Sequence, residues 1–249
     1  MCGIVGAVAE RNVVPILMEG LRRLEYRGYD SAGIAIRTDE GISRIRRVGK
    51  VQELQNALDE TPVRGGTGIS HTRWATHGVP NETNAHPHLS SNTVAIVHNG
   101  IIENYEELRD DLKSKGYEFT SDTDTETVAH RIHFNLQNAD DFVGAVRMTV
   151  AELEGAYAIA VISADQPEQL VIARQGAPAV VGLGIDENFV ASDVAALLPV
   201  TRNFQFLEEG DVALVERKQV TIWDERGNVV DRPVRESALD ADAAERGEF

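Results

Sequence analysis

The octapeptide MCGIVGAV, residues 1–8, joins the chain's only cysteine, Cys2, to a run of small apolar residues. The run extends over residues 3–9 and has the composition of a buried strand. A thiol reacts as the thiolate, so it needs a base or a lowered pKa. If Met1 is removed, the α-amine of Cys2 is such a base, because its reference pKa of about 7.7–8.0 lies close to the roughly 8.5 of a thiol. The alternative is a structural cysteine at the start of a strand.

The composition is that of a globular protein. The 249 residues are 42% hydrophobic and 26% charged, which is enough apolar material for a sizeable core. A single cysteine forms no internal disulfide. We expect neither a transmembrane span nor a signal peptide, since the sequence has no apolar run of about 18 residues and no basic N-terminal segment. The expected location is the cytoplasm.

The chain is strongly acidic. Its 40 Asp and Glu against 24 Lys and Arg give a net charge of −16. Nucleic acid and anionic membranes both need a positive surface, so we expect neither as a partner. Two readings of the charge stay open: an ordinary acidic protein, or a halophilic one whose self-repulsion is screened in a salt-rich cytoplasm.

The order of predicted elements indicates an α+β fold. Strands and helices alternate up to about Leu153, with a long loop rich in Pro, Asn and His running to Ser91, and short strands follow from Gly155. This order favours two packed antiparallel sheets with helices outside. The predicted helices are Asn12–Tyr26, 51–60, Tyr105–Lys115, Thr125–Leu136 and Asp140–Leu153. A doubly wound nucleotide fold is disfavoured because no G-x-G-x-x-G opens a helix.

Three further segments carry a family resemblance. They are LRRLEYRGYDSAG (Leu21–Gly33), HTRWATHG (His71–Gly78) and HNGIIENY (His98–Tyr105), the last followed by SDTDTE (Ser121–Glu126). Together with MCGIVGAV, the set resembles the glutaminase domain of class II glutamine amidotransferases, which are N-terminal-nucleophile enzymes. The resemblance implies a four-layer αββα sandwich. It also implies an enzyme that hydrolyses glutamine to glutamate and ammonia through a Cys2 thioester, without a cofactor.

The resemblance assigns the catalytic roles. Cys2 is the nucleophile, and the oxyanion is stabilised by the Asn99 side-chain amide and the Gly100 backbone N–H. One such donor is typically worth about a hundred- to a thousandfold in rate. An Asn-Gly pair alone usually marks a turn, so the assignment depends on the accompanying motifs.

The resemblance also assigns the residues that hold glutamine. Arg73 binds its carboxylate, to which a guanidinium fork is suited. Asp124 binds its ammonium, although its place before an apolar helix also fits a helix N-cap region. The remaining site residues are Thr76 and His77 in the Arg73 loop, Trp74 on the segment that covers glutamine, and Arg27 and Gly28 as supporting residues beside the nucleophile.

The histidines cluster in the sequence, but their spacing does not match a metal-binding motif. Five of the seven lie between His71 and His98, yet no H-E-x-x-H or paired C-x-x-C accompanies them. We therefore expect hydrogen-bonding roles and no metal.

The expected domains are a glutaminase domain over residues 2–239 and, over 240–249, the start of a linker to a sugar isomerase domain absent from this chain. The spelling EYRGYDSAG resembles members that make an amino sugar phosphate. In those members the isomerase domain binds fructose 6-phosphate and uses the ammonia. For the full-length protein, a homodimer is an open expectation. Two alternatives stay open: the glutaminase domain of another class II amidotransferase, or a non-catalytic glutamine-sensing or docking module.

Overall fold

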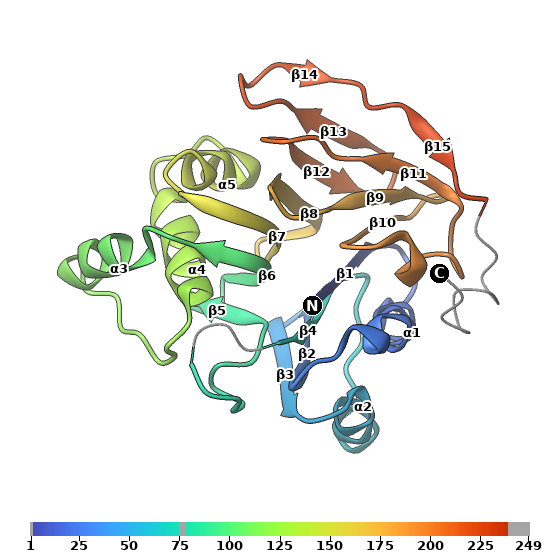
Figure 1. Ribbon diagram of the computed structural model, residues 1–249, viewed down its shortest axis with the longest axis horizontal. Helices are drawn as coiled ribbons and strands as arrows, with labels where there is room; N and C mark the ends of the chain where they lie inside the picture. The colour runs from blue at the N-terminus through green and yellow to red at the C-terminus, as the bar shows by residue number, and fades with distance from the viewer. Residues whose placement is uncertain (1, 75–77, 239–249) are drawn as a thin grey trace.

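The computed structural model describes residues 2–74 and 78–238, which form two antiparallel sheets with helices outside them (Figure 1). In this part of the chain the larger sheet has eight strands. In spatial order they are β15 (Val234–Glu236), β11 (Asn203–Phe206), β9 (Val180–Leu183), β10 (Asn188–Ala191), β1 (Gly3–Val8), β4 (Thr67–Arg73), β2 (Ser31–Thr38) and β3 (Gly41–Val48).

The smaller sheet has seven strands within the same described residues. In spatial order they are β14 (Val229–Val230), β13 (Val220–Trp223), β12 (Val212–Glu216), β8 (Gln166–Gln175), β7 (Gly155–Ser163), β6 (Val94–Ile102) and β5 (His88–Ser90). Strand β5 lies inside the segment that the sequence predicted as loop. It has three residues, too few to show a strand pattern.

The helices form the outer layers. They are α1 (Val14–Leu24), α2 (Val51–Glu60), α3 (Tyr105–Ser114), α4 (Asp124–Asn135) and α5 (Phe142–Val150), with short 3-10 turns η1 (Glu25–Arg27) and η2 (Val194–Ala196). Helix α1 tolerates Pro15 because the residue stands in its first turn, where no backbone donor is needed. Helix α4 begins one residue before the predicted start because Thr123 is the N-cap and accepts a hydrogen bond from the Glu126 N–H. Among the described residues, no helix is long and apolar enough to cross a membrane.

Three apolar clusters show how the layers pack. Alternate residues of β1 face opposite ways, since side chains on a strand alternate between its two faces. Ile4 and Val8 belong to the core between the sheets, whereas Val5 and Ala7 pack with α1 and α2. A third cluster joins the smaller sheet to α4 and α5. The α+β fold predicted as a four-layer αββα sandwich is confirmed, with α1 and α2 on one side and α3–α5 on the other (Figure 1).

The central position of β1 determines where Cys2 lies. β1 is hydrogen-bonded to β10 on one side and to β4 on the other, with Gly3 opposite Thr72. Cys2 therefore lies beside the end of β4, next to Arg73 and Trp74. The nucleophile predicted from the sequence is held by one of the most buried strands of the fold.

Candidate active site

A cavity of about 530 Å³ brings together residues from distant parts of the chain. Seven of the ten residues predicted for the site line this cavity, and an eighth, Gly28, lies against one of them. Those in the lining itself are Cys2, Arg27, Arg73, Trp74, Asn99, Gly100 and Asp124, and Gly28 lies against the Trp74 ring. The other two, Thr76 and His77, lie outside the described residues.

Cys2 is half-buried, and backbone groups hold its sulfur. The Trp74 N–H donates to Sγ at 3.1 Å, and the thiol donates to the Trp74 carbonyl at 3.6 Å. Burial raises the pKa of the Cys2 thiol, although the hydrogen bond from Trp74 opposes the shift. The thiol is therefore protonated near neutral pH, and a reaction at Sγ needs a base close by.

Asn99 and Gly100 lie near the end of β6, where the smaller sheet approaches Cys2. The Asn99 Nδ2 donates to the Cys2 carbonyl at 3.2 Å, and its Oδ1 lies 2.9 Å from His71 Nε2. Gly100 has φ +120°, and a Cβ there would lie 2.0 Å from the Ala156 carbonyl oxygen. Only glycine fits at position 100. Both residues line the cavity beside the thiol.

Arg73 and Asp124 give the cavity one buried cation and one buried anion, with 4% and 3% of their surfaces exposed. Arg73 Nη1 lies 3.9 Å from Asp30 Oδ1, and Nη2 donates to the Gly78 carbonyl at 3.4 Å. Asp124 Oδ2 accepts a hydrogen bond from the Ile102 N–H at 2.9 Å. Asp124 is the first residue of α4, and Thr123 is the N-cap of this helix. Asp124 can therefore belong to the start of the helix and line the cavity at the same time.

The supporting residues lie in the cavity lining or next to it. Arg27 pairs with Asp193, which follows β10. Gly28 has φ +73°, and a Cβ there would lie 3.0 Å from Trp74 Cζ3. Gly28 thus lets the indole lie against the backbone, while 56% of the Trp74 surface stays exposed.

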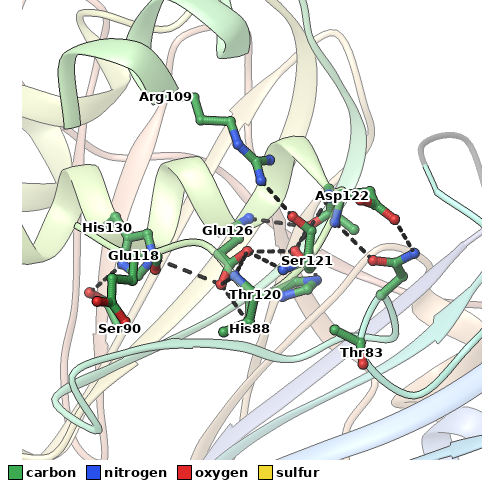
Figure 2. Close-up of polar contacts among 12 residues, drawn as sticks. Thr83, His88, Ser90, Arg109, Glu118, Thr120, Ser121, Asp122, Glu126 and His130 are labelled. Atoms are coloured by element: carbon green, nitrogen blue, oxygen red, sulfur yellow. Dashed lines mark hydrogen bonds and ion pairs between the residues drawn. The ribbon is translucent and has the colours of Figure 1, made fainter. Parts of the chain in front are cut away.

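A buried carboxylate, Glu126, fixes the segment that leads into α4, and the sequence did not single out its role. Figure 2 shows Glu126 facing Thr120 and Ser121. It accepts hydrogen bonds from the backbone N–H and the hydroxyl of both residues, at 2.7–3.1 Å. Burial acts to raise the pKa of Glu126, but these hydrogen bonds bring it below its usual range. The spacing of Thr123 and Glu126 matches a capping box, yet the Glu126 side chain binds the residues before the cap.

The same segment is tied to the loop that follows Arg73. The Asp122 N–H donates to Asn84 Oδ1 at 3.0 Å, and Asn84 Nδ2 donates to Asp122 Oδ2 at 3.2 Å. Asn84 Nδ2 also donates to the Val79 carbonyl at 3.1 Å. Asn84 therefore ties the loop that follows Arg73 to the segment that leads into Asp124.

Three histidines of the sequence cluster, His71, His86 and His88, are buried, and the His86 ring contacts the other two. The His71 and His86 rings lie 4.3 Å apart, and the His86 and His88 rings 5.0 Å apart. Burial lowers the pKa of His71 to about 3 and holds those of His86 and His88 well below their usual value. These rings are neutral at physiological pH. Within residues 2–74 and 78–238, no group of His, Cys, Asp and Glu is placed to hold a metal ion.

Comparison with known proteins gives a consistent result. The family model described as "Glutamine amidotransferase domain" matches residues 71–199. A curated relative from Shewanella oneidensis, "Glutamine--fructose-6-phosphate aminotransferase [isomerizing]", is 60% identical over 249 residues. A relative of the same name from Pseudomonas putida is 58% identical over 250 residues. Each match covers 100% of this chain and 41% of the relative, so the chain spans less than half the length of these relatives.

Solved structures agree on the fold. The glutamine phosphoribosylpyrophosphate amidotransferase of B. subtilis, complexed with ADP and GMP, superposes with a TM-score of 0.78 at 24% identity. The match covers 92% of this chain and 50% of that one. A structure titled as the allosteric regulatory enzyme of purine biosynthesis gives the same TM-score at 25% identity, with the same coverage.

Proposed function

The chain belongs to the glutamine amidotransferase family, and from this premise we propose that it hydrolyses glutamine to glutamate and ammonia through a thioester at Cys2. The observation that carries the proposal is the convergence of Cys2, Asn99, Gly100, Arg73 and Asp124 on one cavity of about 530 Å³. A sulfur nucleophile, oxyanion donors and one charge of each sign are the groups that this reaction requires.

The first half of the reaction forms the thioester. Removal of Met1 frees the α-amine of Cys2, which takes the thiol proton while Sγ attacks the side-chain amide carbon of glutamine. The oxyanion accepts hydrogen bonds from Asn99 Nδ2 and the Gly100 N–H. An amide NH₂ has two hydrogens, so Asn99 keeps its bond to the Cys2 carbonyl as well. The C–N bond then breaks, and the ammonium of Cys2 returns its proton to the departing nitrogen, which leaves as ammonia.

The second half releases glutamate. Water attacks the thioester carbonyl while the Cys2 amine takes one of its protons, and the same donors hold the second oxyanion. The C–S bond breaks and the sulfur recovers a proton. Throughout, Arg73 holds the substrate carboxylate and Asp124 its ammonium, with Thr76, His77, Trp74, Arg27 and Gly28 completing the site.

The proposed fate of the ammonia follows from the relatives' name. We infer that residues 2–239 form the glutaminase domain and that residues 240–249 begin a linker to an isomerase domain that binds fructose 6-phosphate. In that arrangement the ammonia is used for glucosamine 6-phosphate synthesis. The homodimer and the cytoplasmic location expected from the sequence belong to the same proposal.

The test measures glutamate and ammonia released by the purified chain, after mass spectrometry has established that Met1 is absent. We expect hydrolysis of glutamine, no glucosamine 6-phosphate when fructose 6-phosphate is added, and loss of hydrolysis in Cys2→Ala with an unchanged circular dichroism spectrum. Full activity of Cys2→Ala would contradict the assignment of Cys2 as the nucleophile. A folded, Met1-free chain with no turnover would favour the glutamine-sensing or docking module.

A further inference from the structure

We propose that His71 is a positioning residue that sets the orientation of the Asn99 side-chain amide and so presents its NH₂ group to the reaction at Cys2. The inference rests on the proposed function, because it concerns the amide expected to stabilise the oxyanion. His71 lies on β4 of the larger sheet and Asn99 on β6 of the smaller one. The contact between them therefore bridges the two sheets beside the thiol.

The hydrogen bonds at Asn99 are consistent with one orientation of its amide. Oδ1 lies 2.9 Å from His71 Nε2, and Nδ2 lies 3.2 Å from the Cys2 carbonyl oxygen. An amide oxygen only accepts hydrogen bonds and an amide nitrogen only donates them. A rotation of the amide by about 180° would place its oxygen against the Cys2 carbonyl, and the two acceptors would repel each other.

This orientation requires the hydrogen of His71 to be on Nε2. The assignment follows from the Cys2 carbonyl, which can only accept and so fixes Nδ2 on its side and Oδ1 on the side of His71. The neighbouring ring is compatible with it, because His86 Nδ1 lies 3.3 Å from the same nitrogen and can accept from it when its own hydrogen is on Nε2. His71 has none of its surface exposed, and burial lowers its pKa to about 3. A neutral imidazole carries one N–H, and here that N–H faces the Asn99 oxygen. Hydrogen on Nδ1 instead would set the Nε2 lone pair against the Asn99 oxygen and work against the orientation that the Cys2 carbonyl favours.

The consequence for catalysis is specific to the oxyanion. Without a donor at position 71, only the hydrogen bond to the Cys2 carbonyl still orients the Asn99 amide, so the orientation that offers an N–H at the cavity is populated less completely. Complete removal of one oxyanion donor typically costs about a hundred- to a thousandfold in kcat, so we expect a partial loss of about ten- to a hundredfold. Substrate binding through Arg73 and Asp124 stays intact, and so does the nucleophilicity of Cys2.

The experiment compares two reactions of the same thiol. Glutamine hydrolysis builds an oxyanion, whereas alkylation by iodoacetamide displaces iodide from a saturated carbon and builds none. In His71→Phe we expect kcat to fall about ten- to a hundredfold, with KM and the alkylation rate close to wild type. His71→Gln keeps a side-chain N–H and should recover much of the loss. The control is His133→Phe, at a histidine that bonds Tyr117 and does not line the cavity.

A double-mutant cycle tests whether His71 acts through Asn99. If it does, His71→Phe adds no further loss in the Asn99→Ala background, because the amide that it orients is gone. If the factor by which His71→Phe lowers kcat is the same in the Asn99→Ala background as in wild type, the proposal is overturned. An unchanged kcat in His71→Phe alone would also overturn it. A parallel fall in alkylation would also overturn it by showing a merely structural role.

A spectroscopic readout separates this inference from the proposed function. Long-range ¹H–¹⁵N correlation of the imidazoles reports which ring nitrogen carries the hydrogen, and it needs no turnover. We expect the Nε2–H form at His71, and the Nδ1–H form would overturn the inference. If wild type shows this form but does not hydrolyse glutamine, the proposed function fails while the orientation of Asn99 stands.

Discussion

Arg73 and Asp124 are the charges proposed to hold a bound amino acid in the cavity, and both are almost fully buried. Removing either leaves the opposite charge of glutamine without its partner. Losing one partner of a buried charge pair costs about 2–5 kcal/mol, and each 1.4 kcal/mol or so is tenfold in kcat/KM. We predict that Arg73→Ala and Asp124→Asn lower kcat/KM for glutamine by at least about tenfold. Asp124→Asn is the sharper variant, because its amide oxygen can still accept from the Ile102 N–H.

The control for these variants is iodoacetamide, which carries neither charge of the amino-acid backbone. Its reaction with Cys2 should proceed at a similar rate in wild type, Arg73→Ala and Asp124→Asn. Unimpaired glutamine hydrolysis by Arg73→Ala would show that Arg73 does not bind the substrate carboxylate, and the loop around Arg73 would then have another function.

Residues that line the cavity were predictable from the sequence, whereas the residues that hold them in place were not. Cys2, Asn99 and Asp124 stand in motifs whose letters carry the resemblance, and the structure brings them to one cavity. Their roles stay predictions. His71 and Glu126 stand in the same motifs, but their importance comes from contacts across the sandwich or with the preceding turn. Sequence spacing does not reveal such contacts.

At the scale of elements, the start of α4 depends on Glu126. This carboxylate accepts four donor groups of Thr120 and Ser121, and the segment they belong to leads directly to Asp124. In Glu126→Gln, one accepting oxygen becomes an NH₂ group that faces donors. Since a buried donor left unsatisfied costs about 1–3 kcal/mol, we predict a fall of that size in the free energy of unfolding. We also predict a rise in KM for glutamine with a smaller change in kcat.

Glu118→Gln is the matched control, because Glu118 is an exposed carboxylate of the same segment whose backbone carbonyl faces His130. Urea unfolding and steady-state kinetics on both variants provide the measurement. Equal stabilities and equal KM values for the two would show that the Glu126 hydrogen bonds do not hold this segment.

The elements themselves were largely predictable, for a physical reason. Each long strand and helix carries an apolar pattern of its own period, so β1 and α1 through α4 agree with the prediction to within a few residues. The predicted helix Asp140–Leu153 is shorter in the structure, Phe142–Val150; it starts later because Asp141 is its N-cap. The short strand β5 was missed, since its pairing with β6 involves only His88, Leu89 and Ser90.

At the scale of the whole molecule, the buried histidines make stability depend on pH. His71, His86 and His88 have lowered pKa values in the folded protein, so the unfolded chain takes up their protons first as the pH falls below about 6.5. The contribution of these three neutral rings to the free energy of unfolding is therefore fully present above a pH of about 6.5 and is lost as the pH falls below it. Three such groups give a slope of up to about 4 kcal/mol per pH unit. Urea unfolding above and below this pH should show the loss, and no proton uptake on unfolding would contradict it.

The net charge of −16 predicts that salt stabilises the folded chain. Even if every Lys and Arg were paired, 16 carboxylates would remain in excess, and compaction brings them together. Raising the ionic strength from 0.1 to 1 M shortens the screening length from about 10 to about 3 Å, which weakens this repulsion. Salt also weakens surface ion pairs such as Arg217–Glu10, but exposed pairs contribute only about 0–1 kcal/mol each. We therefore expect Tm to rise with KCl.

A variant with fewer charges tests whether repulsion is the cause. Glu40, Glu60 and Glu107 are exposed and stand on three different parts of the surface. Replacing all three by Gln removes negative charge with little change in shape. The triple variant should have a higher Tm than wild type at low salt and a shallower rise with KCl, because less repulsion remains to be screened. A wild-type Tm that stays flat from low to molar KCl would instead favour an ordinary acidic surface, whose carboxylates are far enough apart for water alone to screen them.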